Sequence, residues 1–163
     1  LRSRDPPVSA QVSTAHRPPS PNRDRITELK LTKQMKRNLN GHLAIPQGVI
    51  RIEAEETDWG VDFPRLQSVH IPDSVTEIGN NAFKGCTYLS SVLIPDSVTQ
   101  IGDGAFQGCS SLSSVLIPDS VTQIGRYAVA GCSSLSSVSI PDSVTKIGDG
   151  AFTRCSSLST VSI

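Results

Sequence analysis

Apolar residues recur with a fixed period from position 71 to the end of the sequence. Isoleucine stands at positions 71, 94, 117, 140 and 163, a constant spacing of 23 without slippage. The same spacing places one proline, one cysteine and one leucine in each copy, as in Pro95, Cys109 and Leu112. A period of about 20–29 residues with a Leu-x-x-Val-x-Ile core is typical of a solenoid in which every copy contributes one strand. Low-complexity disorder is a poor interpretation, because the apolar residues keep their register.

The residues within one copy, IPDSVTQIGDGAFQGCSSLSSVL, can be assigned to a strand and its corners. In the preceding LSSVLI we expect Leu89, Val92 and Ile94 to face the core, because β-branched residues at alternating positions favour a strand. Pro95 should end that strand, since it has no backbone donor for the ladder. Strands stacked at about 4.8 Å per coil would then pair as a parallel sheet along one face.

The second half of each copy predicts the return path of the coil. Val98 and Ile101 bring the chain back to the core through a second short strand or a turn. Gly102 suits a corner that needs a positive φ or a close approach of two backbones. Ala105 and Phe106 are expected to fill the side opposite the sheet.

A degenerate copy precedes the regular ones. Residues 45–71 begin with the same Ile-Pro-x-x-Val pattern and end with the same Leu-x-x-Val-x-Ile, but the interval between their two isoleucines is 26 rather than 23. They lack the cysteine; Phe63 is expected in its place, and Trp59 in place of the phenylalanine. Further upstream, Ile26, Leu29 and Leu31 repeat the strand pattern alone. We therefore expect three parts: a disordered Pro/Ser/Arg-rich arm at 1–25, a cap with a degenerate repeat at 26–70, and four regular repeats at 71–163.

The regular copies resemble the leucine-rich repeats of the BspA-like family, whose unit has this length and the skeleton IP…V..IG..AF..C..L..V.I. The resemblance covers residues 71–163 closely and 45–70 loosely. It implies a right-handed solenoid of the leucine-rich-repeat type with one parallel β-sheet face and short second strands or turns on the other side. Such proteins are often surface proteins of bacteria and protists, and some are adhesins. One departure is Val129, which replaces the phenylalanine; Tyr127 either fills the resulting gap or projects outward beside Arg126.

Charge is distributed unevenly along a chain with no net charge. Residues 1–37 hold 9 Lys and Arg against 3 Asp and Glu, a net charge of +6, whereas residues 71–163 hold 4 against 7, a net charge of −3. The overall balance argues against a dedicated nucleic-acid partner. The basic arm is interpreted as a solvated linker, with a polyanion-binding tail as the alternative. For residues 30–37 (KLTKQMKR) a charged turn of the cap is favoured over a membrane-surface helix.

The sequence has no apolar run long enough for a transmembrane helix, so no membrane insertion is expected within it. It begins without a methionine and stops where a fifth copy would start, and we therefore expect that it is a fragment or a processed product. Localisation stays open. The resemblance favours the cell surface or the extracellular space, and an intracellular place is the alternative.

The four cysteines are interpreted as a ladder of core thiols rather than as disulfides or a metal site. They are Cys86, Cys109, Cys132 and Cys155, and every gap equals the full repeat period, whereas zinc ligands usually come in closely spaced pairs. The recurring aspartates are interpreted as turn residues, because one carboxylate per coil is too sparse for calcium. No cofactor, metal or catalytic set is predicted, and we expect a protein that is not an enzyme.

The candidate binding residues are those that alternation turns away from the core on the strand side. They are small and uncharged apart from two leucines and one histidine: Ser68, His70, Ser91, Leu93, Ser114, Leu116, Ser137, Ser139, Thr160 and Ser162. Arg126 and Tyr127 form a second, variable patch. The leading hypothesis is a non-enzymatic protein-protein interaction module, part of a surface or adhesion protein with an unidentified protein ligand. The alternative is a structural spacer or an intracellular scaffold that carries a functional domain elsewhere; the oligomeric state is left open.

Overall fold

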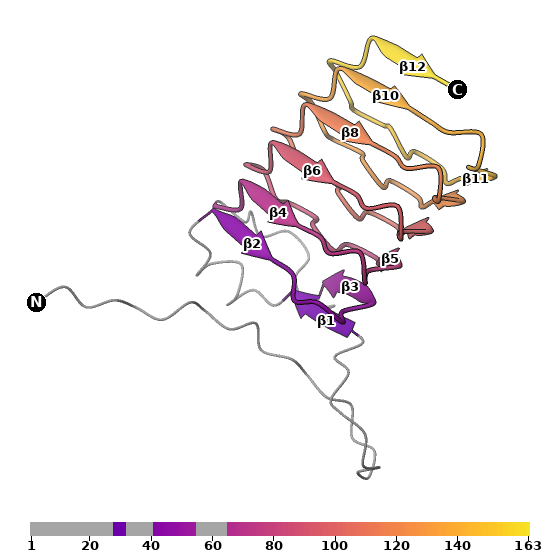
Figure 1. The fold of residues 1–163 in the computed structure, drawn as a ribbon. Helices are drawn as coiled ribbons and strands as arrows, with labels where there is room; N and C mark the ends of the chain where they lie inside the picture. Colours follow the sequence, from indigo (N-terminus) through magenta and orange to yellow (C-terminus); the bar gives the residue numbers. More distant parts are fainter. Residues whose placement is uncertain (1–27, 32–40, 55–64) are drawn as a thin grey trace, which may run out of the picture.

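The computed structural model describes residues 28–31, 41–54 and 65–163, which form a parallel β-solenoid of about five turns (Figure 1). Each turn of the chain contributes one strand to each of two sheets. The described residues lie in strands, turns and bends, with no helix among them. The predicted solenoid, in which every copy contributes one strand to a parallel sheet, is therefore confirmed.

The first sheet consists of three-residue strands that stand side by side along one face of the solenoid (Figure 1). Its order is β2 (His42–Ala44), β4 (Ser68–His70), β6 (Ser91–Leu93), β8 (Ser114–Leu116), β10 (Ser137–Ser139) and β12 (Thr160–Ser162). Neighbouring strands pair in parallel at equivalent positions, so that Val92 lies beside Val69 and Val115. The strand predicted from Leu-x-x-Val-x-Ile is thus present in every described coil.

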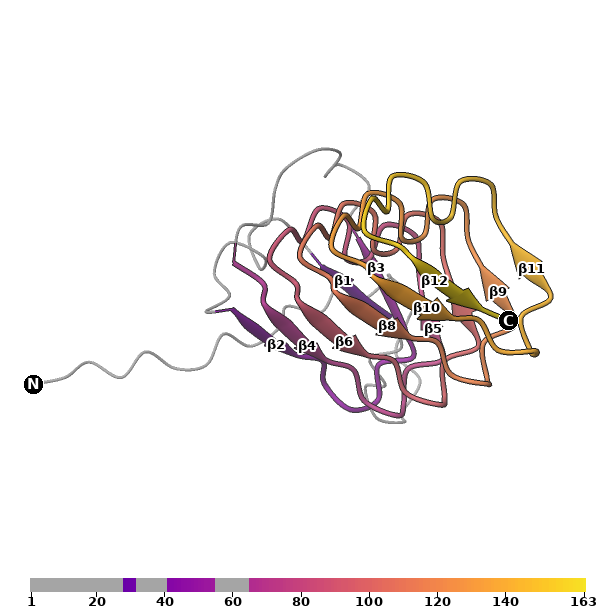
Figure 2. The same cartoon turned by 90° about the horizontal axis from the view of Figure 1, so that it is seen from above.

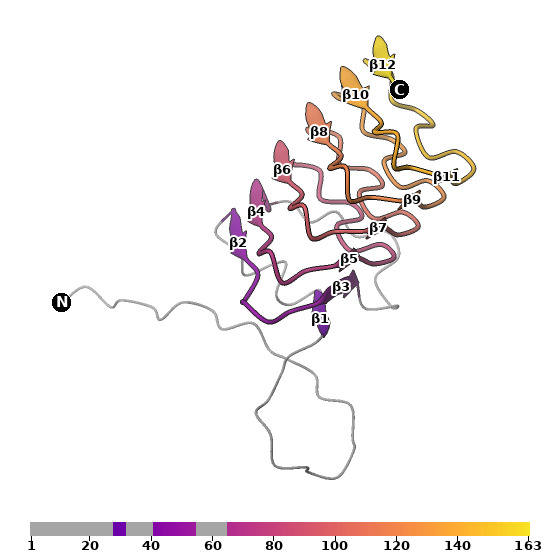
Figure 3. The same cartoon turned by 45° about the vertical axis from the view of Figure 1, so that its right-hand side comes forward.

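The second sheet runs along the opposite side of each coil, as Figures 2 and 3 show. Its order is β1 (Glu28–Leu31), β3 (Arg51–Ala54), β5 (Glu77–Ile78), β7 (Gln100–Ile101), β9 (Gln123–Ile124) and β11 (Lys146–Ile147). The four strands of the regular repeats have only two residues, because the glycine that follows each of them turns the chain. The second stretch predicted at Val98 to Ile101 therefore ends in a strand, Gln100–Ile101.

The earliest strand, β1, belongs to this second sheet. It was expected to repeat the Leu-x-x-Val-x-Ile strand, but it pairs with β3, with Glu28 beside Arg51 and Leu29 beside Ile52. Arg51 follows Glu28 by the same interval that separates the regular copies, so their period already holds here. Trp59, Phe63 and most of the residues 30–37 lie outside the described residues, as does the arm at 1–25.

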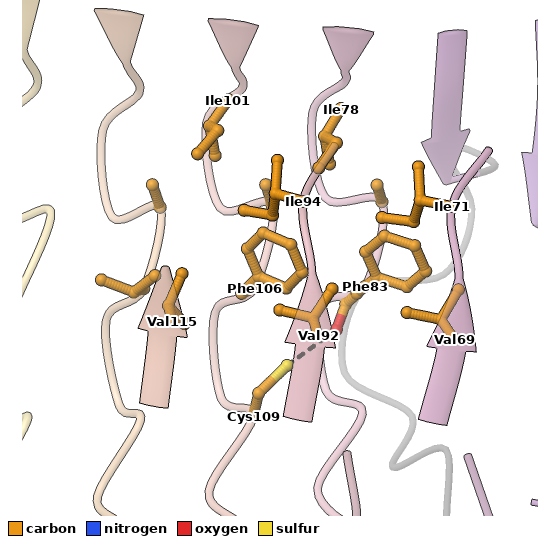
Figure 4. Close-up of a cluster of buried hydrophobic side chains, with 14 of the residues drawn as sticks. Val69, Ile71, Ile78, Phe83, Val92, Ile94, Ile101, Phe106, Cys109 and Val115 are labelled. Atoms are coloured by element: carbon orange, nitrogen blue, oxygen red, sulfur yellow. Dashed lines mark hydrogen bonds between the residues drawn. The ribbon is translucent and has the colours of Figure 1, made fainter. Parts of the chain in front are cut away.

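The core lies between the two sheets and is built from one side chain of each kind per coil. Phe83 and Phe106 are fully buried and stack with ring centroids 5.4 Å apart (Figure 4). The apolar residues of both sheets, such as Val92 of β6 and Ile101 of β7, face the same interior (Figure 4). In the third regular copy Val129 occupies the phenylalanine position and is also buried.

The glycine after each second-sheet strand is required by the close approach of neighbouring coils. A Cβ atom on Gly102 would lie 2.7 Å from the carbonyl carbon of Gly79, and one on Gly125 would lie 2.4 Å from that of Gly102. Neither glycine has a positive φ. Of the two reasons foreseen for this glycine, close approach is the one that applies, whereas Gly108 has a φ of 75° in its turn.

Serine and threonine hydroxyls at the corners donate hydrogen bonds from each coil to the coil before it. The Ser97 hydroxyl donates to the carbonyl of Val75 at 2.6 Å, and Ser120 repeats this bond to Val98. The hydroxyls of Ser113 and Thr122 donate to carbonyls one full period earlier in the chain. The abundant hydroxyl residues thus extend the backbone ladder around the corners of each coil.

Candidate protein-binding face

The outer face of the first sheet carries the side chains that flank each buried valine. In β6, β8 and β10 the middle residue is buried and the two outer residues are exposed, whereas in β12 of the last coil the middle residue, Val161, is 50% exposed as well. The predicted residues all lie on this face, and all are exposed except Ser68. Ser68 is half-buried, since its hydroxyl is hydrogen-bonded to Nδ1 of His42 at 2.6 Å.

Two leucines form the apolar centre of this face. Leu93 is 69% exposed and Leu116 is 63% exposed, and they are register partners on β6 and β8. His70 precedes them in the same row, and Ser139 follows. Apart from His70, the other predicted residues of the face are serines and one threonine, so these two leucines offer most of its apolar surface to a partner.

A shallow groove of about 540 Å³ runs along the edge of this face, across the coils. We name it the Leu-Pro-Asp groove after three of the rows of residues that line it: His70, Leu93 and Leu116; Pro72, Pro95 and Pro118; and Asp73, Asp96 and Asp119. The proline lies two residues after the end of each strand and begins a turn, and the aspartate is the second residue of that turn. In the turn from Pro95 to Val98 the amide of Val98 donates to the carbonyl of Pro95 at 3.0 Å. The turn role predicted for the aspartates is confirmed, and all three are exposed.

The Arg126–Tyr127 patch lies apart from this face. Arg126 lines a second groove of about 440 Å³ on the side of the second sheet, which shares no lining residue with the first. Its guanidinium lies 3.1 Å from the carboxylate of Asp149. Of the two alternatives for Tyr127, the structure favours the outward one: the side chain is 48% exposed and lies over Gly150 of the next coil. Its φ of 53° is a strained value for a bulky residue.

Three exposed residues on or near the first sheet were not foreseen. His42 and Ala44 extend the face by one strand, β2. The residues HLAIP align with SVLIP of the later copies, so the same alignment would have identified His42 and Ala44 as outward-facing residues. Tyr88 is 55% exposed just before β6, where the later copies have serine.

The predicted ladder of core thiols is present in the described coils. Cys86, Cys109 and Cys132 are buried, Cys155 is half-buried, and none of the four is in a disulfide. The thiol of Cys109 donates to the carbonyl of Phe83 at 3.2 Å (Figure 4), and Cys132 repeats the bond to Phe106. Burial, together with the neighbouring Cys155, raises the pKa of the Cys132 thiol to about 12, and burial also raises the pKa of Cys155.

The raised pKa of Cys132 predicts a loss of stability at alkaline pH. An unfolded thiol ionises near pH 8.5, whereas the folded thiol keeps its proton to about pH 12. The contribution of this thiol to the free energy of unfolding is therefore complete below pH 8.5 and is lost as the pH rises toward 12. We expect a slope of at most about 1.4 kcal/mol per pH unit from this thiol. Urea unfolding between pH 7 and pH 11 measures it. The variant Cys132→Ala should show a smaller slope, and an equal slope would contradict the assignment.

Within the described ranges, no group of three His, Cys, Asp or Glu side chains is placed to hold a metal ion. Nor does that part of the chain contain a helix with the length and hydropathy needed to cross a membrane.

Comparison with known proteins identifies what the chain is similar to. Residues 62–163 match the family described as "BspA type Leucine rich repeat region (6 copies)". No curated protein matches the chain. Among solved structures, it is similar to a leucine-rich cell surface protein from Faecalibacterium prausnitzii, with 38% identity and a TM-score of 0.70 over 78% of this chain and 33% of that one.

Two further structures share the fold. A leucine-rich repeat protein from T. pallidum is 28% identical, with a TM-score of 0.68 over 82% of this chain and 62% of that one. The pneumococcal vaccine antigen PcpA is 21% identical, with a TM-score of 0.64 over 83% of this chain and 32% of that one, which shows likeness of fold alone. The chain therefore spans less than two thirds of the length of each of these proteins.

Proposed function

Because this chain belongs to the BspA-type leucine-rich repeat family, we propose that it is a protein-protein interaction module of a cell-surface protein. It binds its protein ligand through the outer face of the first sheet. The similar protein from F. prausnitzii is a leucine-rich cell surface protein, which supports this location. An adhesive role is part of the same proposal.

The observation that carries the proposal is the exposed pair Leu93 and Leu116. Burying one leucine side chain contributes about 1.5–3 kcal/mol, and the two are neighbours, so one partner side chain can cover both. The surrounding serines are short and uncharged, which lets a partner approach the sheet closely. A face of this kind makes weak single contacts, and several copies acting together strengthen them.

Replacing both leucines by serine tests the proposal. Serine already stands at the equivalent position 139, so the variant Leu93→Ser/Leu116→Ser should keep the fold. We expect it to bind at least about tenfold more weakly to any protein that the chain recognises in a panel of immobilised extracellular matrix proteins. Biolayer interferometry measures the affinity.

Tyr88→Ser is the matched control, because it removes an exposed aromatic side chain that does not lie on β6 or β8. Its binding should equal that of the original chain. Unchanged binding by the double-leucine variant would argue against the face and favour a structural spacer.

A further inference from the structure

The Leu-Pro-Asp groove has a charge of one sign along its length. Asp73, Asp96 and Asp119 are exposed on its wall, and the described residues that line it include no lysine or arginine. The groove of the second sheet differs, because there Arg126 pairs with Asp149 and Lys146 lies nearby. The groove beside the leucines is therefore complementary to a cationic ligand, whereas the other is balanced.

The three carboxylates are also close to one another. They occupy equivalent positions in successive coils, so their backbones are spaced by about 4.8 Å along the stack. Like charges at such a distance repel each other, and a cation placed between two of them relieves that repulsion. The proline and leucine rows line the same groove and supply apolar surface beside the carboxylates. A ligand that fits must present basic groups on one side and apolar groups on the other.

The spacing of the coils selects among backbone conformations for such a ligand. Two coils span about 9.6 Å. One turn of a polyproline II helix has three residues and spans about 9.3 Å, so every third side chain meets an equivalent site two coils further on. In a β-strand, side chains on one face recur at about 6.6 Å, which matches neither one coil nor two. The geometry favours a ligand with a period of three residues.

We propose that the Leu-Pro-Asp groove binds an extended, proline-containing basic segment of the partner protein, lying across the coils in the polyproline II conformation. This inference rests on the proposed function, since it specifies the partner of the same face. Lysine or arginine at every third position lies against alternate aspartates, Asp73 and Asp119. The apolar residues between them pack on Leu93 and Leu116.

A synthetic peptide with the triplet Lys-Leu-Pro repeated three times, with both ends blocked, serves as the probe. NMR titration of the full chain, labelled at its leucine methyl groups, measures its affinity. We expect saturable binding with shifts of the Leu93 and Leu116 methyls, weakened by raising the salt from about 50 mM to about 500 mM. Two control peptides are the repeated Glu-Leu-Pro triplet and a block peptide with the composition of the probe but its lysines adjacent. Both should bind at least about tenfold more weakly. Equal affinity for either control peptide would overturn the proposal.

Two triple variants with the same change in charge locate the binding site. Asp73→Asn/Asp96→Asn/Asp119→Asn keeps the turn-forming side chains and should weaken probe binding at least about tenfold. Glu77→Gln/Asp103→Asn/Asp149→Asn removes three charges on the second-sheet side and should leave it unchanged. Equal losses in both variants would mean unspecific attraction and overturn the proposal. So would methyl shifts that depend on protein concentration without peptide, because a second copy would then occupy the groove.

The two proposals fail in different ways. If the probe does not bind while Leu93→Ser/Leu116→Ser still loses a protein ligand, the face is functional and the basic segment is wrong. If the double-leucine variant keeps its protein ligand, the proposed function itself is wrong.

Discussion

Replacing Phe106 by alanine is expected to lower the free energy of unfolding by about 3–5 kcal/mol. Phe106 is fully buried, stacks on Phe83 and lies one coil before the smaller Val129. The removed ring leaves a cavity that the neighbouring coils cannot close, because backbone bonds hold their spacing: the amide of Phe106 donates to the carbonyl of Ala128 at 2.7 Å.

Phe152→Ala is the matched control for this substitution. Phe152 occupies the same position in the last described coil and is partly exposed, so its loss should cost clearly less. Urea unfolding followed by circular dichroism measures both variants. Equal losses of stability would mean that the phenylalanine position is not packed as described.

The second large effect is expected for Gly125→Ala, which should lower the free energy of unfolding by about 3 kcal/mol or more. The new Cβ atom would lie 2.4 Å from the carbonyl carbon of Gly102 and 2.5 Å from the amide nitrogen of Asp103. Both are backbone atoms of the preceding coil. They cannot move without stretching the bond from the amide of Gly125 to the carbonyl of Ile101, which is 2.8 Å long.

Gly131→Ala separates close contact from backbone conformation. Gly131 has a φ of 73°, but a Cβ atom there would meet its nearest neighbour at an ordinary 3.6 Å. The variant Gly131→Ala should lose only about 1–2 kcal/mol of unfolding free energy, which is the cost of placing a residue with a side chain in a left-handed conformation. Thermal and urea unfolding of the two variants should rank Gly125→Ala as the more damaging. The reverse order would show that the coils are spaced more widely at Gly125.

The repeat period was sufficient to predict the core and the strands. An apolar residue that returns once in every period must occupy the same place in each coil, which is why Val92 and Phe106 were assigned correctly. The same argument reached Gly102, because a corner shared by stacked coils brings two backbones together. It did not predict which sheet contains β1, since the apolar alternation of Leu29 and Leu31 would look the same in either sheet.

The candidate site was predictable residue by residue but not as a surface. Alternation along a strand determines that Leu93 faces outward, and it does so for each strand separately. Whether the aspartates lie beside the leucines depends on how sharply the chain bends at Pro95, which is a property of the folded corner. Tyr127 was left open for a similar reason, because its position depends on the space above Gly150 in the following coil.

The hydroxyl bonds at the corners have a consequence for how such a gene can change. The bonds of Ser113 and Thr122 link equivalent positions one period apart, so every inner coil meets a neighbour of its own kind on both sides. Unequal recombination that adds or deletes the coding length of one whole repeat inserts or removes one coil and creates no new type of contact. The length of the solenoid can therefore change between descendants in steps of about 4.8 Å, while each coil keeps the same fold.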